Sequence, residues 1–252
     1  MNGPHSSGPR LSVNVNKVAT LRNSRGGAVP SVVDAIRVCL EAGATGITIH
    51  PRADERHITR HDVQAIAAYL APKRREVELN IEGDPRPDLL EMIREVRPHQ
   101  CTLVPVRPGE ITSQAGWPAD TPVAELRTQI ADLQSRGVRV SAFIDPEKGA
   151  VEWAASTGAD RVELYTEPFA RAFKEGEAQA EASFRKYVEA ANVAHALGLG
   201  VNAGHDLDLD NLALFRGLPH LDEVSIGHAL ISHALYVGLS RAVKDYLAAC
   251  RI

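Results

Sequence analysis

A short stretch of the sequence, residues 46–57, combines an aliphatic run with titratable side chains. Its first four residues are Gly-Ile-Thr-Ile, and His50, Arg52 and His57 follow. At these spacings an extended segment can point all three side chains at one polar ligand. Pro51 ends the strand pattern. The stretch therefore predicts a buried strand that ends in a reactive loop. A polar surface turn is the alternative that this stretch alone leaves open.

Two carboxylates occupy comparable places in other aliphatic stretches. Glu82 follows Leu-Asn-Ile, and Glu163 follows Arg-Val. Burial at a strand end opposes ionisation and raises the pKa of a carboxyl group, which can then act as a general base or stabilise a cationic intermediate. For either glutamate considered alone, a salt bridge to a neighbouring strand is the structural alternative. Because His50 and His205 follow further strands, we interpret the two carboxylates and the two histidines as one acid–base site.

Glycines in the last third of the sequence predict an anion site. Gly227 and His228 come directly after the run Val-Ser-Ile, where a helix is expected to begin. Free backbone N–H groups at a helix start bind phosphate, and the last strands of barrels often hold that site. The segment Ala-Gly-His that ends at His205 adds further N–H groups, and Arg25 supplies positive charge from a glycine-flanked loop. A tight turn that needs glycine is the alternative.

The first aliphatic stretch delivers Asn14, Asn16 and Lys17, which suit phosphate or hydroxyl groups. Lys17 also permits a Schiff-base mechanism, because it is the one lysine at a predicted strand end. The histidines and glutamates of the candidate site are acceptable metal ligands, but they lack the close paired spacing of a zinc motif. We therefore predict no metal site.

These residues need elements that bring their strand ends together. A helical segment, a glycine and a short aliphatic strand recur at Gly43, Gly137, Gly158 and Gly198, and glycine after a helix supplies the left-handed residue of an αβ loop. The predicted strands are 11–16, 46–50, 78–82, 100–104, 139–144, 161–165, 200–203 and 223–226. Eight βα units predict an α/β fold, a closed (β/α)8 TIM barrel. An open doubly wound sheet is disfavoured, since no Gly-x-Gly-x-x-Gly turn follows the first strand.

Three segments extend or complete this minimal barrel. Residues 105–121 are long for a βα loop and predict a lid. Residues 166–180, which include Phe169 and Phe173, predict an extra helix that packs on a neighbouring subunit. The last helix is expected over residues 228–249.

Composition is that of an α/β protein outside the membrane. Apolar residues make up 44% of the 252 residues and aromatic residues only 5%, which favours aliphatic strands covered by helices. The net charge of −4 indicates neither a nucleic-acid surface nor a membrane anchor. Three widely spaced cysteines fit a reducing, cytoplasmic setting. Residues 1–10 lack the apolar core of a signal peptide and predict a flexible arm, and residues 11–252 predict one barrel domain.

Several motifs together resemble the pyridoxine 5′-phosphate synthase family, which closes the pyridine ring in the deoxyxylulose-phosphate route to vitamin B6. The matching segments are Val13-Asn14-Val15-Asn16-Lys17-Val18-Ala19-Thr20-Leu21-Arg22-Asn23-Ser24-Arg25-Gly26, Gly46-Ile47-Thr48-Ile49-His50-Pro51-Arg52 with Arg56-His57-Ile58, Leu103-Val104-Pro105, Val201-Asn202-Ala203-Gly204-His205 and Ile226-Gly227-His228-Ala229. The resemblance runs from about Leu11 to the C-terminus. No single motif would suffice, but the combination is highly specific.

The resemblance implies a condensation of 1-deoxy-D-xylulose 5-phosphate with 3-amino-2-oxopropyl phosphate to pyridoxine 5′-phosphate, phosphate and water, without metal or organic cofactor. The implied catalytic residues are His50 and Glu82 as proton acceptors, His205 as proton donor and Glu163 as stabiliser of the transition state. The implied aminoketone-phosphate site is Asn14, Arg25, Gly227 and His228, and the implied pentulose-phosphate site is Arg52, His57 and Thr112. The family also implies a lid after the fourth strand and a homo-oligomer, commonly an octamer.

The sequence departs from the common family pattern at several substrate-contact positions. Asn16 and Lys17 stand where Asp-His is usual; Lys17 would still attract a phosphorylated sugar but cannot shuttle a proton at neutral pH as histidine can. Asp206 stands where glycine usually follows the histidine of strand seven, and its carboxylate repels phosphate unless the side chain points away. Val106 replaces a usually acidic residue in the predicted lid. The substrate contacts, more than the reaction class, are expected to differ.

Two other functions stay open. A phosphosugar aldolase or isomerase on the same barrel would use Lys17 as the Schiff-base lysine or Glu82 as the enolising base. A paralogue that binds a phosphorylated ligand without turnover is suggested by Asn16 and Asp206.

Overall fold

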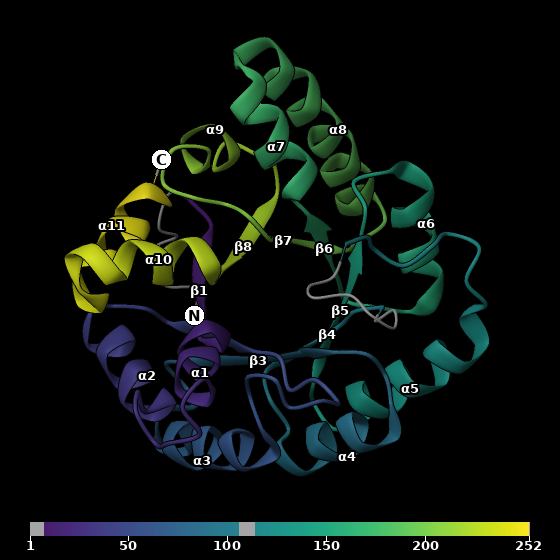
Figure 1. Cartoon of the computed structure of the whole chain (residues 1–252). Coiled ribbons are helices and arrows are strands. Elements are labelled where there is room, and N and C mark those ends of the chain that lie inside the picture. The colour runs from purple at the N-terminus through teal and green to yellow at the C-terminus, as the bar shows by residue number, and fades with distance from the viewer. Residues whose placement is uncertain (1–7, 106–113, 252) are drawn as a thin grey trace.

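Eight parallel strands of the described chain close into a barrel in the order β1 to β8, which confirms the predicted TIM barrel (Figure 1). The computed structural model describes residues 8–105 and 114–251. The strands are β1 (Arg10–Asn14), β2 (Gly46–Ile49), β3 (Glu78–Gly83), β4 (Gln100–Leu103), β5 (Arg139–Ile144), β6 (Arg161–Tyr165), β7 (Gly200–Gly204) and β8 (Leu221–Ile226). Pairing of Leu11 in β1 with Val224 in β8 closes the cylinder.

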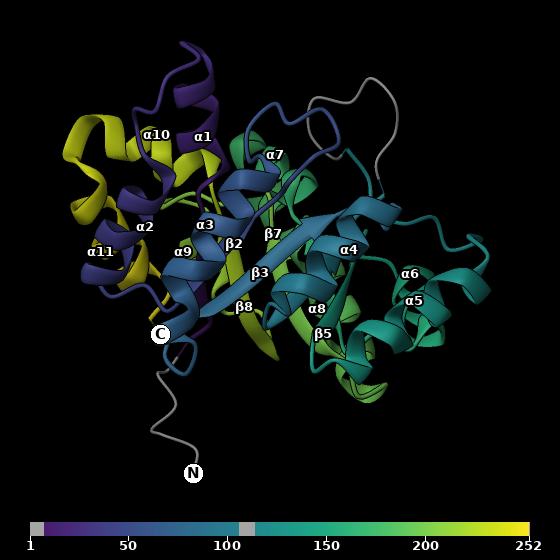
Figure 2. The ribbon, with the colours of Figure 1, turned by 90° about the horizontal axis from the view of Figure 1, so that it is seen from below.

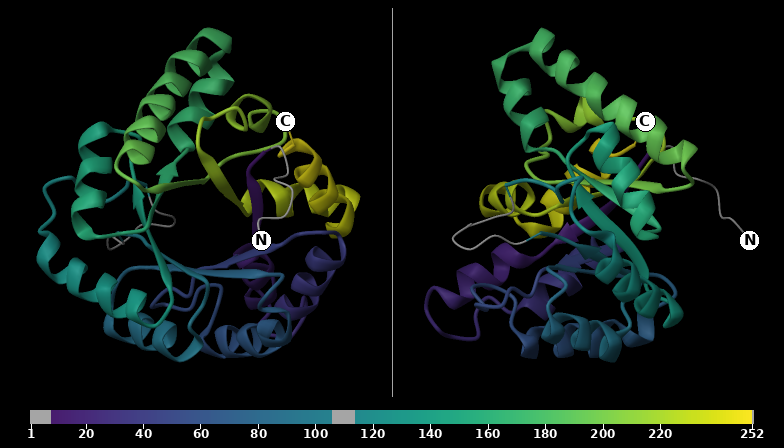
Figure 3. Two further views of the ribbon diagram at one scale, coloured as in Figure 1. Left: turned by 180° about the vertical axis from the view of Figure 1, so that it is seen from behind. Right: turned by 90° about the vertical axis from the view of Figure 1, so that its right-hand side faces the viewer.

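Helices surround the strands on the outside of the barrel (Figure 3). They are α1 (Asn16–Asn23), α2 (Val32–Glu41), α3 (Arg60–Leu70), the 3-10 helix η1 (Ala71–Lys73), α4 (Pro87–Val96), α5 (Val123–Ser135), α6 (Lys148–Thr157), α7 (Glu167–Glu175), α8 (Glu177–Ala196), α9 (Leu212–Phe215), α10 (His228–Val237) and α11 (Leu239–Ala249). Aliphatic residues of helices and strands, such as Ile36 and Ile47, are fully buried in one core. Each such side chain contributes about 1.5–3 kcal/mol. No helix of the described residues is long and apolar enough to cross a membrane.

The junctions between helices and strands follow the predicted glycine pattern. Gly158, for example, ends α6 with φ 84, a left-handed conformation that a residue with a Cβ rarely adopts, and β6 begins at Arg161. The sharp reversal lets each strand start directly beneath its helix. All carboxyl ends of the strands consequently lie at one end of the barrel.

Of two predicted helical features, one is wrong and one is confirmed in part. The last helix is broken, because Gly238 takes φ 85 and ψ 148 and separates α10 from α11. The predicted extra helix is present as α7 and packs on α8 of the same chain, while its packing on a neighbouring subunit stays a prediction. Phe169 is fully buried, with its ring centroid 6.0 Å from Tyr187 and 5.0 Å from Phe215.

The predicted chain boundaries shift slightly at the first strand. β1 begins at Arg10, one residue inside the predicted arm, and ends at Asn14. Asn16 therefore lies in α1 rather than in a strand. Residues 1–7 of the predicted arm and residues 106–113 of the predicted lid lie outside the described residues.

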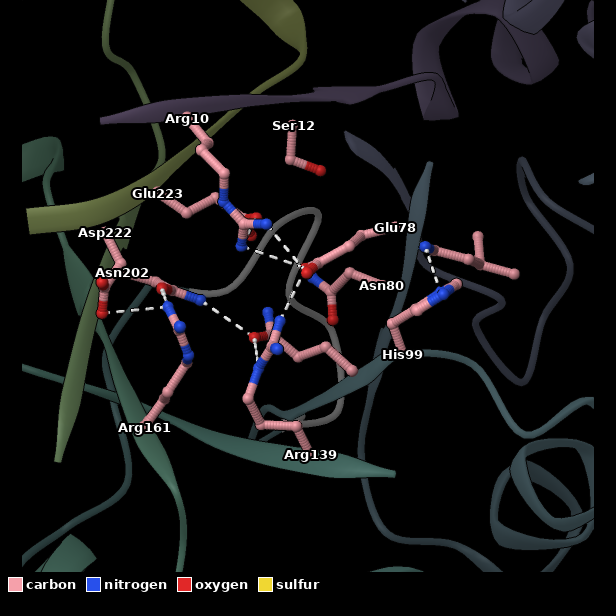
Figure 4. A network of polar contacts seen from close by, with 12 residues as sticks. Arg10, Ser12, Glu78, Asn80, His99, Arg139, Arg161, Asn202, Asp222 and Glu223 are labelled. Atoms are coloured by element: carbon pink, nitrogen blue, oxygen red, sulfur yellow. Dashed lines mark hydrogen bonds and ion pairs between the residues drawn. The ribbon is translucent and has the colours of Figure 1, made fainter. Parts of the chain in front are cut away.

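Polar side chains fill the inside of the barrel in layers, because every second residue of a strand points inward. At the amino-terminal ends of the strands, Arg10 pairs with Glu78 at 2.8 Å and with Glu223 at 3.2 Å, and Arg139 pairs with Glu78 at 2.7 Å (Figure 4). Gln100, Arg161, Asn202 and Asp222 complete what we call the ionic layer. It forms the floor beneath the inward residues that follow on each strand.

Candidate active site

A cavity of about 450 Å³ opens at the carboxyl ends of the strands. Strands β1, β2, β3, β6, β7 and β8, with the segments that follow them, supply its wall. The lining residues are Asn14, Asn16, Lys17, Thr20, His50, Arg52, Arg56, His57, Glu82, Glu163, His205, Asp206, Leu207, Ser225, Ile226, Gly227, His228 and Ala229. The cavity thus brings together every predicted site residue of the described chain except Arg25.

Two carboxyl groups, those of Glu82 and Glu163, lie almost completely buried in the cavity floor. Burial raises the pKa of Glu82 well above its usual value, and the nearby carboxylates of Glu163 and Glu223 raise it further. Burial likewise raises the pKa of Glu163 to about 8, with a further contribution from Glu223. Both carboxyl groups can therefore exchange a proton during a reaction.

Two neutral histidines line the same cavity. The Nδ1 atom of His50 lies 3.8 Å from Oε2 of Glu82. Burial lowers the pKa of His50 well below 6.5, helped by the positive surroundings of His57 and Arg52. Burial also lowers the pKa of His205, against the opposing charge of Asp206.

Each histidine keeps one ring nitrogen for a ligand. Nε2 of His50 and Nδ1 of His205 are buried and have no hydrogen-bond partner among the described residues. A buried polar atom without a partner is costly, and such atoms point to a substrate that completes the hydrogen bonds.

The two asparagines after β1 fix the position of His50. The backbone N–H of His50 donates to Oδ1 of Asn16 at 2.9 Å, and the N–H of Asn16 donates to Oδ1 of Asn14 at 3.0 Å. Asn16 is therefore engaged in holding the β2 loop. Lys17, the next residue, lines the cavity from the first turn of α1.

The end of α1 also holds the loop that carries His57. The side-chain amide of Asn23 donates to the carbonyl oxygen of His57 at 2.9 Å. Arg22 donates to the same oxygen at 3.3 Å and is anchored by Asp62, whose Oδ2 atom lies 2.8 Å from its Nη2. Burial, with the charges of Arg52 and Lys17, lowers the pKa of His57 to about 4. His57 is consequently a neutral hydrogen-bonding group at neutral pH.

Two glycines leave space that the site requires. A Cβ added to Gly204 would lie 2.6 Å from Oε1 of Glu163, and one added to Gly227 would lie 3.0 Å from Cβ of Asn14. Gly227 precedes the first residue of α10, His228, and the helix start carries no side-chain cap. Its first N–H groups are therefore available to an anion at the cavity edge.

Asp206 is exposed and has φ 58, the left-handed conformation that the more usual glycine would adopt without strain. Aspartate tolerates this conformation better than most residues with a Cβ. The substitution therefore preserves the turn after β7.

Arg25 is not placed at the predicted anion site. It is exposed beyond the end of α1 and does not line the cavity. An eight-residue helix such as α1 is about 12 Å long, which separates its far end from the strand that it follows. Thr112 lies outside the described residues, so its predicted role stays a prediction.

Three polar cavity residues were not assigned a role from the sequence: Thr20, Arg56 and Ser225. Thr20 lies one helical turn after Asn16, a spacing that places both on one face of α1. Ser225 lies two residues after Glu223 on β8, so strand alternation could have identified it. Arg56 belongs to a motif that the sequence analysis had already matched. No group of three or more histidine, cysteine, aspartate or glutamate residues within 8–105 and 114–251 is arranged to hold a metal ion.

Fold and site together define a TIM-barrel enzyme with an acid–base cavity at the mouth of the barrel. Residues 11–252 match the family described as "Pyridoxal phosphate biosynthesis protein PdxJ". The chain belongs to this family. Its relatives include the pyridoxine 5′-phosphate synthases of Bacteroides fragilis and Porphyromonas gingivalis, each 51% identical over 238 residues, which are 94% of this chain and 97% of the relative.

Solved structures with low identity share the fold. One chain from Aquifex aeolicus, in "Structural study of Project ID from Aquifex aeolicus VF5", has a TM-score of 0.66 at 13% identity. The similarity covers 98% of this chain and 95% of the other. At this identity the likeness supports the barrel architecture alone.

Proposed function

We propose that this protein is a pyridoxine 5′-phosphate synthase of vitamin B6 biosynthesis. The single observation that carries the proposal is the convergence of Glu82, Glu163, His50 and His205 on one cavity of a chain that belongs to the PdxJ family. Imine formation, dehydration and ring closure each need a proton moved, and several groups able to hold or release a proton meet that need.

We assign the substrates as 1-deoxy-D-xylulose 5-phosphate and 3-amino-2-oxopropyl phosphate. His50 and Glu82 accept protons, His205 donates one, and Glu163 stabilises the transition state. The neutral state of His50 supports its assignment as a base, because a base must begin without its proton. The two unpartnered ring nitrogens supply the hydrogen bonds that orient the substrates.

The two phosphates are proposed to bind at opposite sides of the cavity. The start of α10 at Gly227 and His228, with Asn14 beside it, suits the aminoketone phosphate. Arg52 and His57 on the β2 loop suit the pentulose phosphate, and Lys17 adds positive charge between the two.

The decisive experiment mixes the purified protein with both substrates and follows pyridoxine 5′-phosphate by its absorbance. Product formation is expected. Absence of product while both ligands still bind would refute the catalytic assignment and favour a non-catalytic phospho-ligand-binding paralogue.

Borohydride trapping with the pentulose phosphate, followed by mass analysis, distinguishes the Schiff-base alternative. An adduct on Lys17, absent from a Lys17→Met variant, would favour a phosphosugar aldolase or isomerase. We expect no such adduct, because Glu82 and the two histidines already supply the proton-transfer groups.

We also propose that the protein forms a homo-oligomer, by resemblance an octamer. Leu21 of α1 is 53% exposed and Tyr236 of α10 is 89% exposed, on two helices that lie against one another (Figure 2). Leu235 and Val237 extend the same apolar surface, which a second copy could cover. Light scattering should give a mass several times that of one chain, and Tyr236→Lys should lower it.

Location in the cytoplasm is a further part of the proposal. It is supported by Cys39, Cys101 and Cys250, which are free and buried, as expected of a protein from a reducing compartment. Fractionation of the native cell would test it.

A further inference from the structure

The backbone that carries His205 is held in an unfavourable conformation. His205 has φ 83 and Asp206 has φ 58, so two consecutive residues with a Cβ are left-handed immediately after β7. Such a pair persists only where surrounding contacts enforce it. The residues that enforce it are therefore of interest for the function of His205.

Thr166, at the end of β6, makes the contacts that fix this turn. It is fully buried, and its N–H donates to the carbonyl oxygen of Gly204 at 3.0 Å. Its hydroxyl oxygen lies 2.7 Å from that same carbonyl oxygen and in hydrogen-bond contact with the carbonyl oxygen of His205. One hydroxyl thus faces the peptide groups on both sides of the His205 Cα.

Asn211 secures the other half of the pair. Its side-chain amide donates to the carbonyl oxygen of Asp206 at 3.0 Å, while its Oδ1 atom accepts the N–H of Asp208 at 2.9 Å. Asn211 is buried, so solvent does not readily replace these bonds. Side chains from two separate segments consequently hold consecutive carbonyl groups of one turn.

The imidazole ring is confined by neighbours that leave one direction open. Its centroid lies 4.9 Å from that of Phe143 and 5.5 Å from that of Tyr165. These rings restrict the orientation of the imidazole plane, and the backbone angles of His205 fix the direction of its Cα–Cβ bond. The unpartnered Nδ1 of His205 can be aimed at the substrate only while both restraints hold.

We propose that Thr166 is a positioning residue for the reaction: its hydroxyl locks the left-handed backbone of His205 and so aims the imidazole into the cavity. The inference rests on the proposed function, in which His205 is the proton donor. Thr166 does not line the cavity, so it acts through the turn that carries His205.

Three variants test the proposal by steady-state kinetics. Thr166→Val keeps the shape but removes the hydroxyl, and Thr166→Ser restores the hydroxyl. Thr157→Val is the matched control, because Thr157 is equally buried and its hydroxyl donates to the carbonyl oxygen of Ala154 at 2.7 Å, at the end of α6.

Thr166→Val should lower kcat about 100-fold, the loss typical of a reacting group displaced by about 1 Å, with little change in KM. Thr166→Ser should recover most of the activity, and Thr157→Val should retain it. Equal kcat values for the two valine variants, or a loss in Thr166→Val that appears in KM alone, would overturn the proposal.

A second readout does not depend on turnover. In protein labelled with ¹⁵N-histidine, the ring signals of His205, assigned through their absence in His205→Asn, should shift in Thr166→Val and not in Thr157→Val. Unshifted signals would refute the positioning role even if the enzyme is active. Shifted signals in a protein that makes no pyridoxine 5′-phosphate would support positioning while refuting the proposed function.

Discussion

The barrel interior contains carboxylates that differ both in burial and in partners. Glu78 in the ionic layer is bound by Arg10 and Arg139; burial opposes its ionisation, but these bonds outweigh burial and lower its pKa to about 2. Glu82 lies on the same face of β3, four residues on, and burial without a guanidinium partner raises its pKa. The same strand therefore carries one permanently charged and one protonatable carboxyl group.

The difference reflects burial and partners together. Glu78 is partly exposed and bound by two guanidinium groups, whereas Glu223, which is bound by Arg10 but almost fully buried, has a pKa that burial raises. A carboxylate held by arginine lowers the energy of the folded state but gains nothing from accepting a proton. A buried carboxyl group without such a partner can take up or release a proton in a reaction. The ionic layer and the cavity should therefore respond to mutation in opposite ways.

The largest effect is expected for Glu82→Gln. This change removes a proton acceptor from the cavity and should lower kcat about 100- to 10,000-fold, with much less change in substrate binding. The urea midpoint should stay the same or rise, because glutamine is neutral. Steady-state kinetics and urea unfolding check both parts, and equal losses in kcat and affinity would contradict the proton-transfer role.

Glu78→Gln is the matched change in the ionic layer. It leaves Arg10 and Arg139 without their shared carboxylate and should lower the free energy of unfolding by about 1.5–3 kcal/mol, with kcat nearly unchanged. Urea unfolding measures the loss. A variant as stable as the parent would show that the ionic layer does not stabilise the fold and so does not differ from the cavity in this respect.

A smaller effect is expected at the rim of the cavity. Arg52→Lys keeps the charge but loses the fork of donors that suits phosphate, and should raise KM for the pentulose phosphate about 10-fold while leaving kcat within a few-fold. Titration with each substrate separately provides the control. A larger loss of affinity for the aminoketone phosphate than for the pentulose phosphate would show that the two proposed phosphate sites must be assigned the other way round.

The smallest effect is the pH dependence of stability. The folded protein holds a proton on Glu163 from the ordinary pKa of 4.5 up to about 8, so its contribution to stability falls as pH rises through that range. Glu78 has the opposite sign: its contribution is present above 4.5 and is lost as pH falls towards 2. Urea midpoints across pH should show that Glu163→Gln flattens the first slope and Glu78→Gln the second. If Glu163→Gln instead flattened the slope at low pH and Glu78→Gln the slope at high pH, the assigned pKa shifts of the two residues would be refuted.

The barrel and most of its cavity could be predicted from the sequence because their determinants are local. Glycine after a helix and a short aliphatic run locate each strand, and the residue at the end of a strand must face the mouth. The helix break at Gly238 could not be predicted, because a single glycine inside a helical pattern is compatible with either a continuous or a broken helix. The role of Thr166 could not be predicted because its partner at position 205 is distant in sequence. The position of Arg25 could not be predicted because it depends on the exact length of α1.

The seam between β1 and β8 makes the cavity a late product of folding. Asn14 and Gly227 face each other across this seam, although they come from opposite ends of the chain. Contacts between such distant residues carry the largest loop-closure entropy and form slowly. During synthesis the anion site cannot exist until the last strand has been made. Recovery of activity after dilution from denaturant should therefore trail the recovery of helical signal, and so report the moment at which the cylinder closes.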